Sequence, residues 1–113
     1  MISSHFLNKQ GFGLEPVDVR ILEIVSKPWS DWTRITFQIR ILPFRLAPTL
    51  ELSITDENDR VISEVTIIDT PDNEIEFTMH IPKKVNNNRM KLNAILKYEE
   101  NGQIDFRSQY INP

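Results

Sequence analysis

The residues best suited to binding chemistry lie in two short aromatic and basic segments. Trp29 and Trp32 fall within residues 27–34, and Phe44 and Arg45 follow the next apolar run. Tryptophan and arginine dominate binding hot spots because their large flat groups desolvate well at a low cost in entropy. These four residues are therefore the predicted binding site. A structural alternative is that the indole rings cover the open end of a core, and we favour it for Trp32.

A pair of carboxylates, Glu74 and Glu76, comes closest to a catalytic arrangement. On a strand their side chains share a face and lie about 6.7 Å apart along the chain, near the separation used by inverting glycosidases. An exposed strand face lacks the apolar enclosure of a catalytic acid. The sequence carries no nucleophile elbow, phosphate-binding loop or dinucleotide fingerprint. We therefore expect a protein that is not an enzyme and that binds no cofactor.

The distribution of the usual ligands predicts no metal site. The chain has no cysteine and only two histidines, His5 and His80. His80 shares a strand face with Glu76, but roughly 13 Å separates the two, which is too far for metal–ligand bonds of about 2.1 Å. The acidic loop 56–61 has Arg60 at its fifth position and no glycine at its sixth, so it does not fit a helix-loop-helix calcium loop. A looser calcium site would need four loop carboxylates to converge: Asp56, Asp59, Asp69 and Asp72.

Charge is distributed unevenly along the chain. Residues 49–81 contain nine acidic residues and one basic residue, whereas 20–48 and 82–113 are each net basic. The acidic segment predicts either a patch for a basic partner or a surface that faces solvent and basic neighbours within the fold; we favour the second. The net charge of −3 and the pI of about 5.3 disfavour nucleic acids and anionic membranes as partners.

Hydrophobic alternation identifies the elements that must position these residues. Residues 32–42 carry apolar side chains at every second position: Ile35, Phe37, Ile39 and Ile41. This period is typical of a half-buried strand because successive strand side chains point to opposite faces. In residues 17–25 the apolar face changes after Ile21, which predicts a bulge or a crossing between sheets. Similar patterns predict strands over 17–25, 50–55, 61–68 and 75–81.

Residues 89–110 are predicted to form a hairpin of two further strands. A helix over 89–100 is the alternative, but basic residues at its start and acidic residues at its end would oppose the helix dipole. A three-residue loop, 100–102, would pair Tyr98 with Ile104 and Leu96 with Phe106, and it would place Gly102 at the left-handed position. In this register Leu92 faces Tyr110, and four residues point inward: Ile104, Phe106, Ser108 and Tyr110.

Seven short strands without helices predict an all-β fold, an antiparallel two-sheet sandwich or a partly closed barrel. The length of 113 residues, with 40% hydrophobic and 26% charged residues, fits one globular domain. From Val17 to Ile111 the pattern resembles immunoglobulin-like and fibronectin type III-like sandwiches, without the cysteine pair of immunoglobulin domains. This architectural resemblance implies no particular function. We expect one β-sandwich domain over 17–113 and a tail or edge segment over 1–16.

The sequence favours a small non-enzymatic protein-interaction domain. Its partner would be another protein, or a second copy that joins through an unpaired edge strand. The alternative is a sandwich that binds a carbohydrate or another small ligand through Trp29, Trp32 and Phe44. The sequence contains no secretory signal and no long apolar run. We therefore expect a cytoplasmic protein with neither a membrane nor a nucleic-acid partner.

Overall fold

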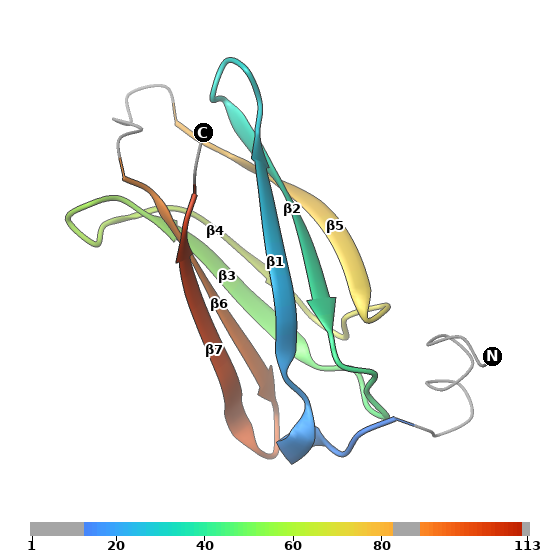
Figure 1. Ribbon diagram of the computed structural model, residues 1–113. Coiled ribbons are helices and arrows are strands. Elements are labelled where there is room, and N and C mark those ends of the chain that lie inside the picture. The colour runs from blue at the N-terminus through green and yellow to red at the C-terminus, as the bar shows by residue number, and fades with distance from the viewer. Residues whose placement is uncertain (1–12, 83–88, 112–113) are drawn as a thin grey trace.

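Seven strands form the fold in the computed structural model, which describes residues 13–82 and 89–111 (Figure 1). The seven predicted strands are all present, including the ambiguous sixth, and the described residues contain no α-helix. Among those residues, no helix has the length and apolar character needed to cross a membrane. A 3-10 turn, η1 (Pro16–Asp18), precedes the strands, which are β1 (Ile21–Pro28), β2 (Arg34–Ile41), β3 (Thr49–Thr55), β4 (Val61–Ile67), β5 (Glu74–His80), β6 (Lys91–Tyr98) and β7 (Gly102–Tyr110).

The strands form two separate antiparallel sheets. One sheet has three strands in the order β1-β2-β5, and the other has four in the order β4-β3-β6-β7. Figure 1 shows the two layers, with β1, β2 and β5 in one and β3, β4, β6 and β7 in the other. The predicted all-β, two-sheet sandwich is therefore confirmed, and its arrangement is consistent with an immunoglobulin-like fold.

The core lies between the inner faces of the two sheets. In β2 the alternating residues Ile35, Phe37, Ile39 and Ile41 are at most 1% exposed. The inner residues of the facing strands β3 and β6 are equally buried: Leu50, Leu52, Ile54, Leu92, Ala94 and Leu96. Burying a side chain of the larger kinds in this set contributes about 1.5–3 kcal/mol. The alternation in the sequence thus predicted which face of each of these strands is inside.

β1 contains the predicted bulge. Ile21 pairs with Ile41 and Glu23 pairs with Arg40, which leaves Leu22 as an extra residue on β1. Both Ile21 and Ile24 are buried, whereas Leu22 is exposed. The extra residue therefore lets β1 keep an apolar inner face on both sides of the bulge.

The β6–β7 hairpin differs from the prediction in its register. Gly102 has the expected left-handed conformation, with φ of 73°. However, Leu96 pairs with Asp105 and Ile95 with Phe106, because the register shifts between Leu96 and Lys97. The expected pairs of Tyr98 with Ile104, Leu96 with Phe106 and Leu92 with Tyr110 were therefore wrong. Tyr98 lies opposite Gly102, and Tyr110 lies opposite Lys91.

The orientation of β7 follows from its contacts with the edge of β1. A carboxylate oxygen of Asp105 accepts the backbone N–H of Ile21 at 2.9 Å, and Arg107 donates to the carbonyl of the same residue at 2.8 Å. Gln109 donates to the Ile24 carbonyl at 2.9 Å. The polar side chains of β7 therefore face β1. Of the four residues predicted to point inward, Ile104 packs against the core, but Phe106, Ser108 and Tyr110 are exposed.

Residues 13–16 lie against the segment that follows β2. The backbone N–H of Leu14 donates to the carbonyl of Pro43 at 2.9 Å, and the N–H of Arg45 donates to the carbonyl of Leu14 at 3.1 Å. Gly13 has φ of 108°, and a Cβ at this position would lie 2.7 Å from the Phe44 carbonyl carbon. Of the predicted tail, residues 1–12 lie outside the described residues, and the part that is described is docked on the domain.

Candidate interaction face

Trp29 follows β1 directly, beside the outer face of the three-stranded sheet. Its backbone N–H donates to the carbonyl of Arg34 at 2.9 Å and closes the β1–β2 hairpin. Its indole N–H donates to Oγ1 of Thr36 at 3.1 Å, and the Arg34 guanidinium carbon lies 4.9 Å from the ring centre. The side chain is 44% exposed. The ring is therefore open to solvent, yet it is held by a hydrogen bond and a cation–π contact.

The hairpin loop gives the second tryptophan a different role. The carboxylate of Asp31 accepts the N–H of Thr33 at 3.0 Å and its hydroxyl at 2.8 Å, and these hydrogen bonds lower the pKa of Asp31. Trp32 adopts a left-handed conformation, with φ of 58°, and packs half-buried against the core. Trp32 therefore packs against the core, as in the structural alternative that we favoured for it, and Trp29 is the exposed member of the pair.

Phe44 and Arg45 lie beyond the opposite end of β2. The eight residues of that strand, at about 3.3 Å each, separate them from Trp29. Phe44 is 3% exposed and belongs to the core, so its ring offers no surface on which a ligand could stack. The Arg45 guanidinium donates to both oxygens of Glu15, at 2.9 and 3.1 Å, and this contact raises the pKa of Arg45. The four predicted site residues therefore form two separate pairs.

Rows of polar side chains cross the outer face of the three-stranded sheet beyond Trp29. The hydroxyls of Thr36 and Thr78 lie 3.0 Å apart. In the next row the amide of Gln38 donates to Glu76 at 2.8 Å. The sequence pattern already placed these residues on outward positions, but it did not show that β5 lies beside β2. These rows arise because two strands far apart in the chain pair with each other, in the register Thr36–Thr78 and Gln38–Glu76, at separations of 42 and 38 residues.

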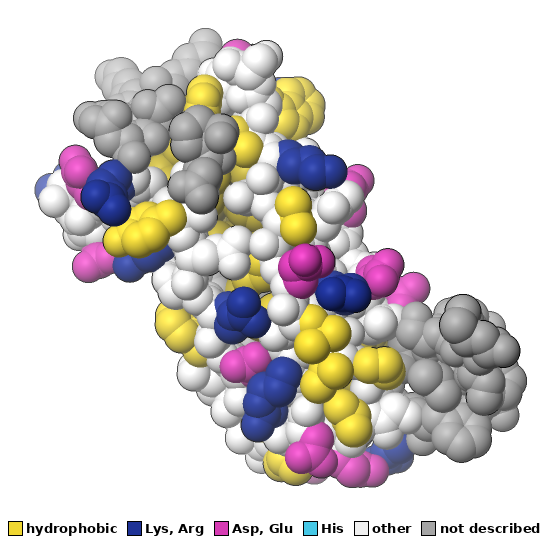
Figure 2. Space-filling view, in the orientation of Figure 1, with side chains coloured by type: hydrophobic (Ala, Val, Ile, Leu, Met, Phe, Trp, Pro, Cys, Tyr) yellow, Lys and Arg dark blue, Asp and Glu magenta, His cyan; other side chains and the backbone are white. Residues whose placement is uncertain are grey.

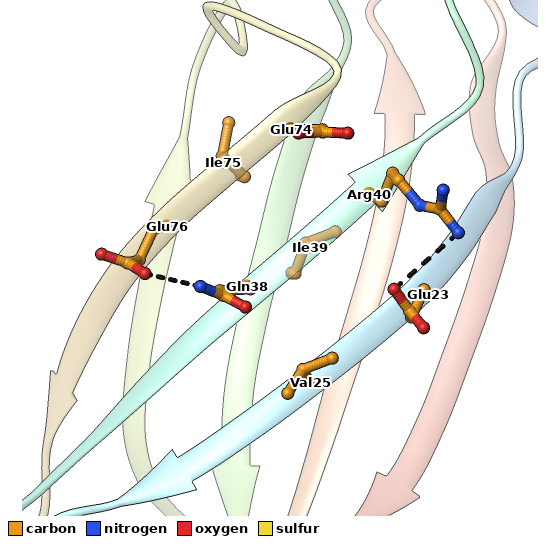
Figure 3. Close-up of a pocket in the computed structure, with 8 residues that line it drawn as sticks. All are labelled: Glu23, Val25, Gln38, Ile39, Arg40, Glu74, Ile75 and Glu76. Atoms are coloured by element: carbon orange, nitrogen blue, oxygen red, sulfur yellow. Dashed lines mark hydrogen bonds and ion pairs between the residues drawn. The ribbon is translucent and has the colours of Figure 1, made fainter.

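A shallow hollow of about 570 Å³ lies at the far end of the same face. Figure 3 shows its side chains: Arg40 on β2 extends toward β1, where its guanidinium lies 3.8 Å from Glu23, and Glu74 and Glu76 lie on β5 at the other side of β2. Glu74 and Glu76, the carboxylates considered for catalysis, are both exposed here. Sequence reasoning missed three members of this group, namely Glu23, Gln38 and Arg40, because they lie on β1 and β2, far in the sequence from the two glutamates of β5. The hollow is open and polar, which suits contact with a charged surface better than enclosure of a substrate.

Part of the acidic segment is paired with basic residues inside the four-stranded sheet. The Lys97 ammonium on β6 lies 3.0 Å from the Glu51 carboxylate on β3. The Lys91 ammonium, also on β6, lies 3.6 Å from the Asp59 carboxylate in the loop between β3 and β4. Figure 2 shows that charged side chains of both signs alternate over the visible face of the molecule. The interpretation that acidic strands face basic neighbours therefore holds for Glu51 and Asp59.

The structure describes no metal centre within residues 13–82 and 89–111. No group of three or more histidine, aspartate or glutamate side chains there could hold a metal ion. His80 is exposed at the end of β5, opposite Arg34 on β2. His5 lies outside the described residues.

Comparison with known proteins identifies a fold and no sequence family. No family model matches the sequence, and no curated protein is significantly similar to it. Solved structures of larger enzymes contain a similar domain. A glycosyl hydrolase family 2 member from Bacteroides cellulosilyticus matches with a TM-score of 0.58 and 12% identity, over 83% of this chain and 14% of that one.

Two β-glucuronidases show the same relationship. The enzyme from Bifidobacterium dentium matches with a TM-score of 0.58 and 19% identity, over 84% of this chain and 18% of its own. The enzyme from Ruminococcus gnavus matches with a TM-score of 0.54 and 8% identity, over 84% and 16% respectively. This chain thus spans less than a fifth of each of these enzymes, and the likeness shows the β-sandwich fold alone.

Proposed function

We propose that this chain is a small non-enzymatic protein-interaction domain that contacts its partner through the outer face of the three-stranded sheet, with Trp29 as the anchor. The observation that carries the proposal is the state of Trp29, which is 44% exposed and held by Thr36 and Arg34. A ring that is already ordered loses little conformational entropy on binding. Arg34 lies against the Trp29 ring, and tryptophan and arginine are among the residue types most enriched in hot spots.

The rest of the face supports a protein partner. The polar side chains of this face and the residues around the hollow lie on three hydrogen-bonded strands, which fix their relative positions. The face carries both carboxylate and guanidinium groups. Such charges steer and orient a complementary protein surface more than they add affinity. The matched enzymes contain this fold as a small part of a longer chain, and a shared fold by itself implies no particular role.

The test compares Trp29→Ala with a matched control, Phe106→Ala. Both side chains are exposed aromatics, at 44% and 49%, but they lie on different sheets. Each variant is immobilised and exposed to lysate of the source cell, and a protein recovered by the wild type is purified and titrated. We expect Trp29→Ala to weaken that binding by at least tenfold, as for a hot spot, and Phe106→Ala to leave it unchanged. Equal binding by both variants, once each is shown to be folded, would contradict the proposed site.

The carbohydrate alternative is tested separately by the fluorescence of Trp29. Of the three aromatic residues predicted for stacking, Phe44 is in the core and Trp32 packs against it. A sugar would therefore have Trp29 as its exposed stacking surface among those three. Saturable quenching of wild-type fluorescence by a glycan, lost in Trp29→Ala, would favour this alternative over a protein partner.

A further inference from the structure

The strand β5 has one edge without backbone partners among the described residues. The β2–β5 ladder is flanked by two hydrogen bonds of 2.8 Å, from the N–H of Ile81 to the carbonyl of Thr33 and from the N–H of Ile41 to the carbonyl of Asn73. In an antiparallel ladder, hydrogen-bonded pairs alternate with pairs that are not bonded. The odd-numbered residues therefore bond to β2, and four residues direct their N–H and C=O groups to the open side: Glu74, Glu76, Thr78 and His80.

The two edge strands on the opposite side of the sandwich, β1 and β7, are partly blocked against strand addition. On β1, the N–H and C=O groups of Ile21 and the carbonyl of Ile24 are bonded by side chains of β7. Pro28, at the end of β1, has no N–H. On β7, the N–H of Phe106 donates to Asp105 at 2.9 Å. Such devices are how β proteins avoid pairing at their edges, and no comparable side-chain contact with the β5 backbone occurs among the described residues.

The inner side chains of β5 are also incompletely covered. Ile75 and Phe77 point toward the core but are only half-buried, unlike their neighbours on β2. Ile67 of β4 and Ile75 line a hollow of about 350 Å³ that also includes Pro71. An added strand at this edge would therefore gain backbone hydrogen bonds and cover apolar surface together.

We propose that β5 pairs with β5 of a second copy, antiparallel, about a two-fold axis at Phe77. This register uses the whole strand and brings the open groups together in reciprocal pairs: Glu74 with the partner's His80, and Glu76 with the partner's Thr78. A shift by two residues in one direction would instead set Glu76 against Glu76 of the partner subunit, and like charges directly opposite one another are destabilising. A shift in the other direction leaves Glu74 outside the paired strands. The proposed register is therefore the one that pairs the whole strand with a second copy and opposes no like charges.

The same axis places the two Phe77 side chains next to each other on the inner face. Phe77 already packs against Phe37 of its own copy, with ring centres 5.6 Å apart. Pairing would extend this contact into a row of four aromatic rings across the interface, in the range of distances at which such rings attract. The result is a continuous sheet of six strands with a Trp29 near each end. The inference does not depend on the proposed function, because it rests on the backbone groups at the β5 edge, whereas the anchor of the proposed function, Trp29, follows β1 at the other side of the sheet. The side chains of Glu74, Glu76 and Thr78 belong to both surfaces.

The experiment measures molar mass in solution over a wide range of protein concentration. The wild-type chain of 13.3 kDa is expected to reach twice that mass as the concentration rises. Thr78→Pro should remove the association, because proline deletes an N–H of the open edge without removing a bond to β2. Ser108→Pro is the matched control, since Ser108 also directs its N–H to an open edge, on β7, and its hydroxyl, like that of Thr78, contacts the neighbouring strand.

A charge exchange tests the register even if the proline variants do not fold. His80→Glu sets two carboxylates opposite each other at each end of the interface and is expected to weaken association roughly tenfold. Adding Glu74→Lys to that variant should restore it, because the new lysine then faces the partner's new carboxylate. A wild type that stays monomeric at every concentration, a dimer that persists in folded Thr78→Pro, or a charge exchange without effect would each overturn the proposal.

Discussion

Replacing Asp105 with alanine tests whether side chains of β7 hold the two sheets together at the β1 edge. The Asp105 carboxylate accepts two backbone N–H groups, those of Ile21 and Phe106, each at 2.9 Å. Phe106 is exposed, so water can replace the carboxylate there. Ile21 is 3% exposed, so its N–H would be left with poor access to water. A buried donor left unpaired costs about 1–3 kcal/mol, and we expect a loss of about 2 kcal/mol.

The assay is thermal unfolding together with amide hydrogen exchange. For a chain of 113 residues, the unfolding entropy is roughly 0.24 kcal/mol/K, so the expected loss lowers the Tm by about 8 °C. The exchange of the Ile21 amide should accelerate more than that of amides in β3. Ser108→Ala, on the outward face of the same strand, is the control and should change stability by less than about 0.5 kcal/mol. An Asp105→Ala protein that keeps both its Tm and the protection of the Ile21 amide would refute the reasoning.

Three further predictions concern the core and the hairpin. Phe37→Ala should cost about 3–5 kcal/mol in urea unfolding, since Phe37 is fully buried; an unchanged midpoint would place it outside the core. The Tyr98 hydroxyl donates to the Leu46 carbonyl at 2.8 Å, and burial raises the pKa of Tyr98 to about 12. Because the folded pKa lies above the unfolded value of about 10, stability should fall as the pH rises from 10 through 12, and Tyr98→Phe should flatten that fall in alkaline titrations followed by circular dichroism. Gly102→Ala should cost only about 1–2 kcal/mol in guanidinium unfolding, because φ is 73° and no atom beyond its two chain neighbours lies within 4 Å of the new Cβ; a larger loss would indicate a steric clash.

The sequence by itself determined the strands and the burial of most of their faces. Alternation over β2 and β3 predicted Ile35, Phe37, Leu50 and Leu52 as core residues, and all four are at most 2% exposed. The face change after Ile21 predicted the bulge. These features are local, because the two faces of a strand are set by the direction of successive side chains. The need for glycine at position 102, where the β6–β7 turn enters β7, is local as well. It depends only on the left-handed backbone conformation of that one residue.

The tertiary structure alone decided which residues come together from distant segments. On β7 the apolar alternation of Phe106 and Tyr110 favoured an inward face, but the hydrogen-bonding groups of β1 lie beside this strand and bind its polar side chains instead. Phe44 is of a residue type common in binding sites, yet it is buried in the core. The open edge of β5 likewise depends on which strands pair in the sheet. The exposed Trp29 ring is fixed by a hydrogen bond to Thr36 on the neighbouring strand. Pairing between strands is set by register and packing over long sequence separations, for which a single sequence carries no local signal.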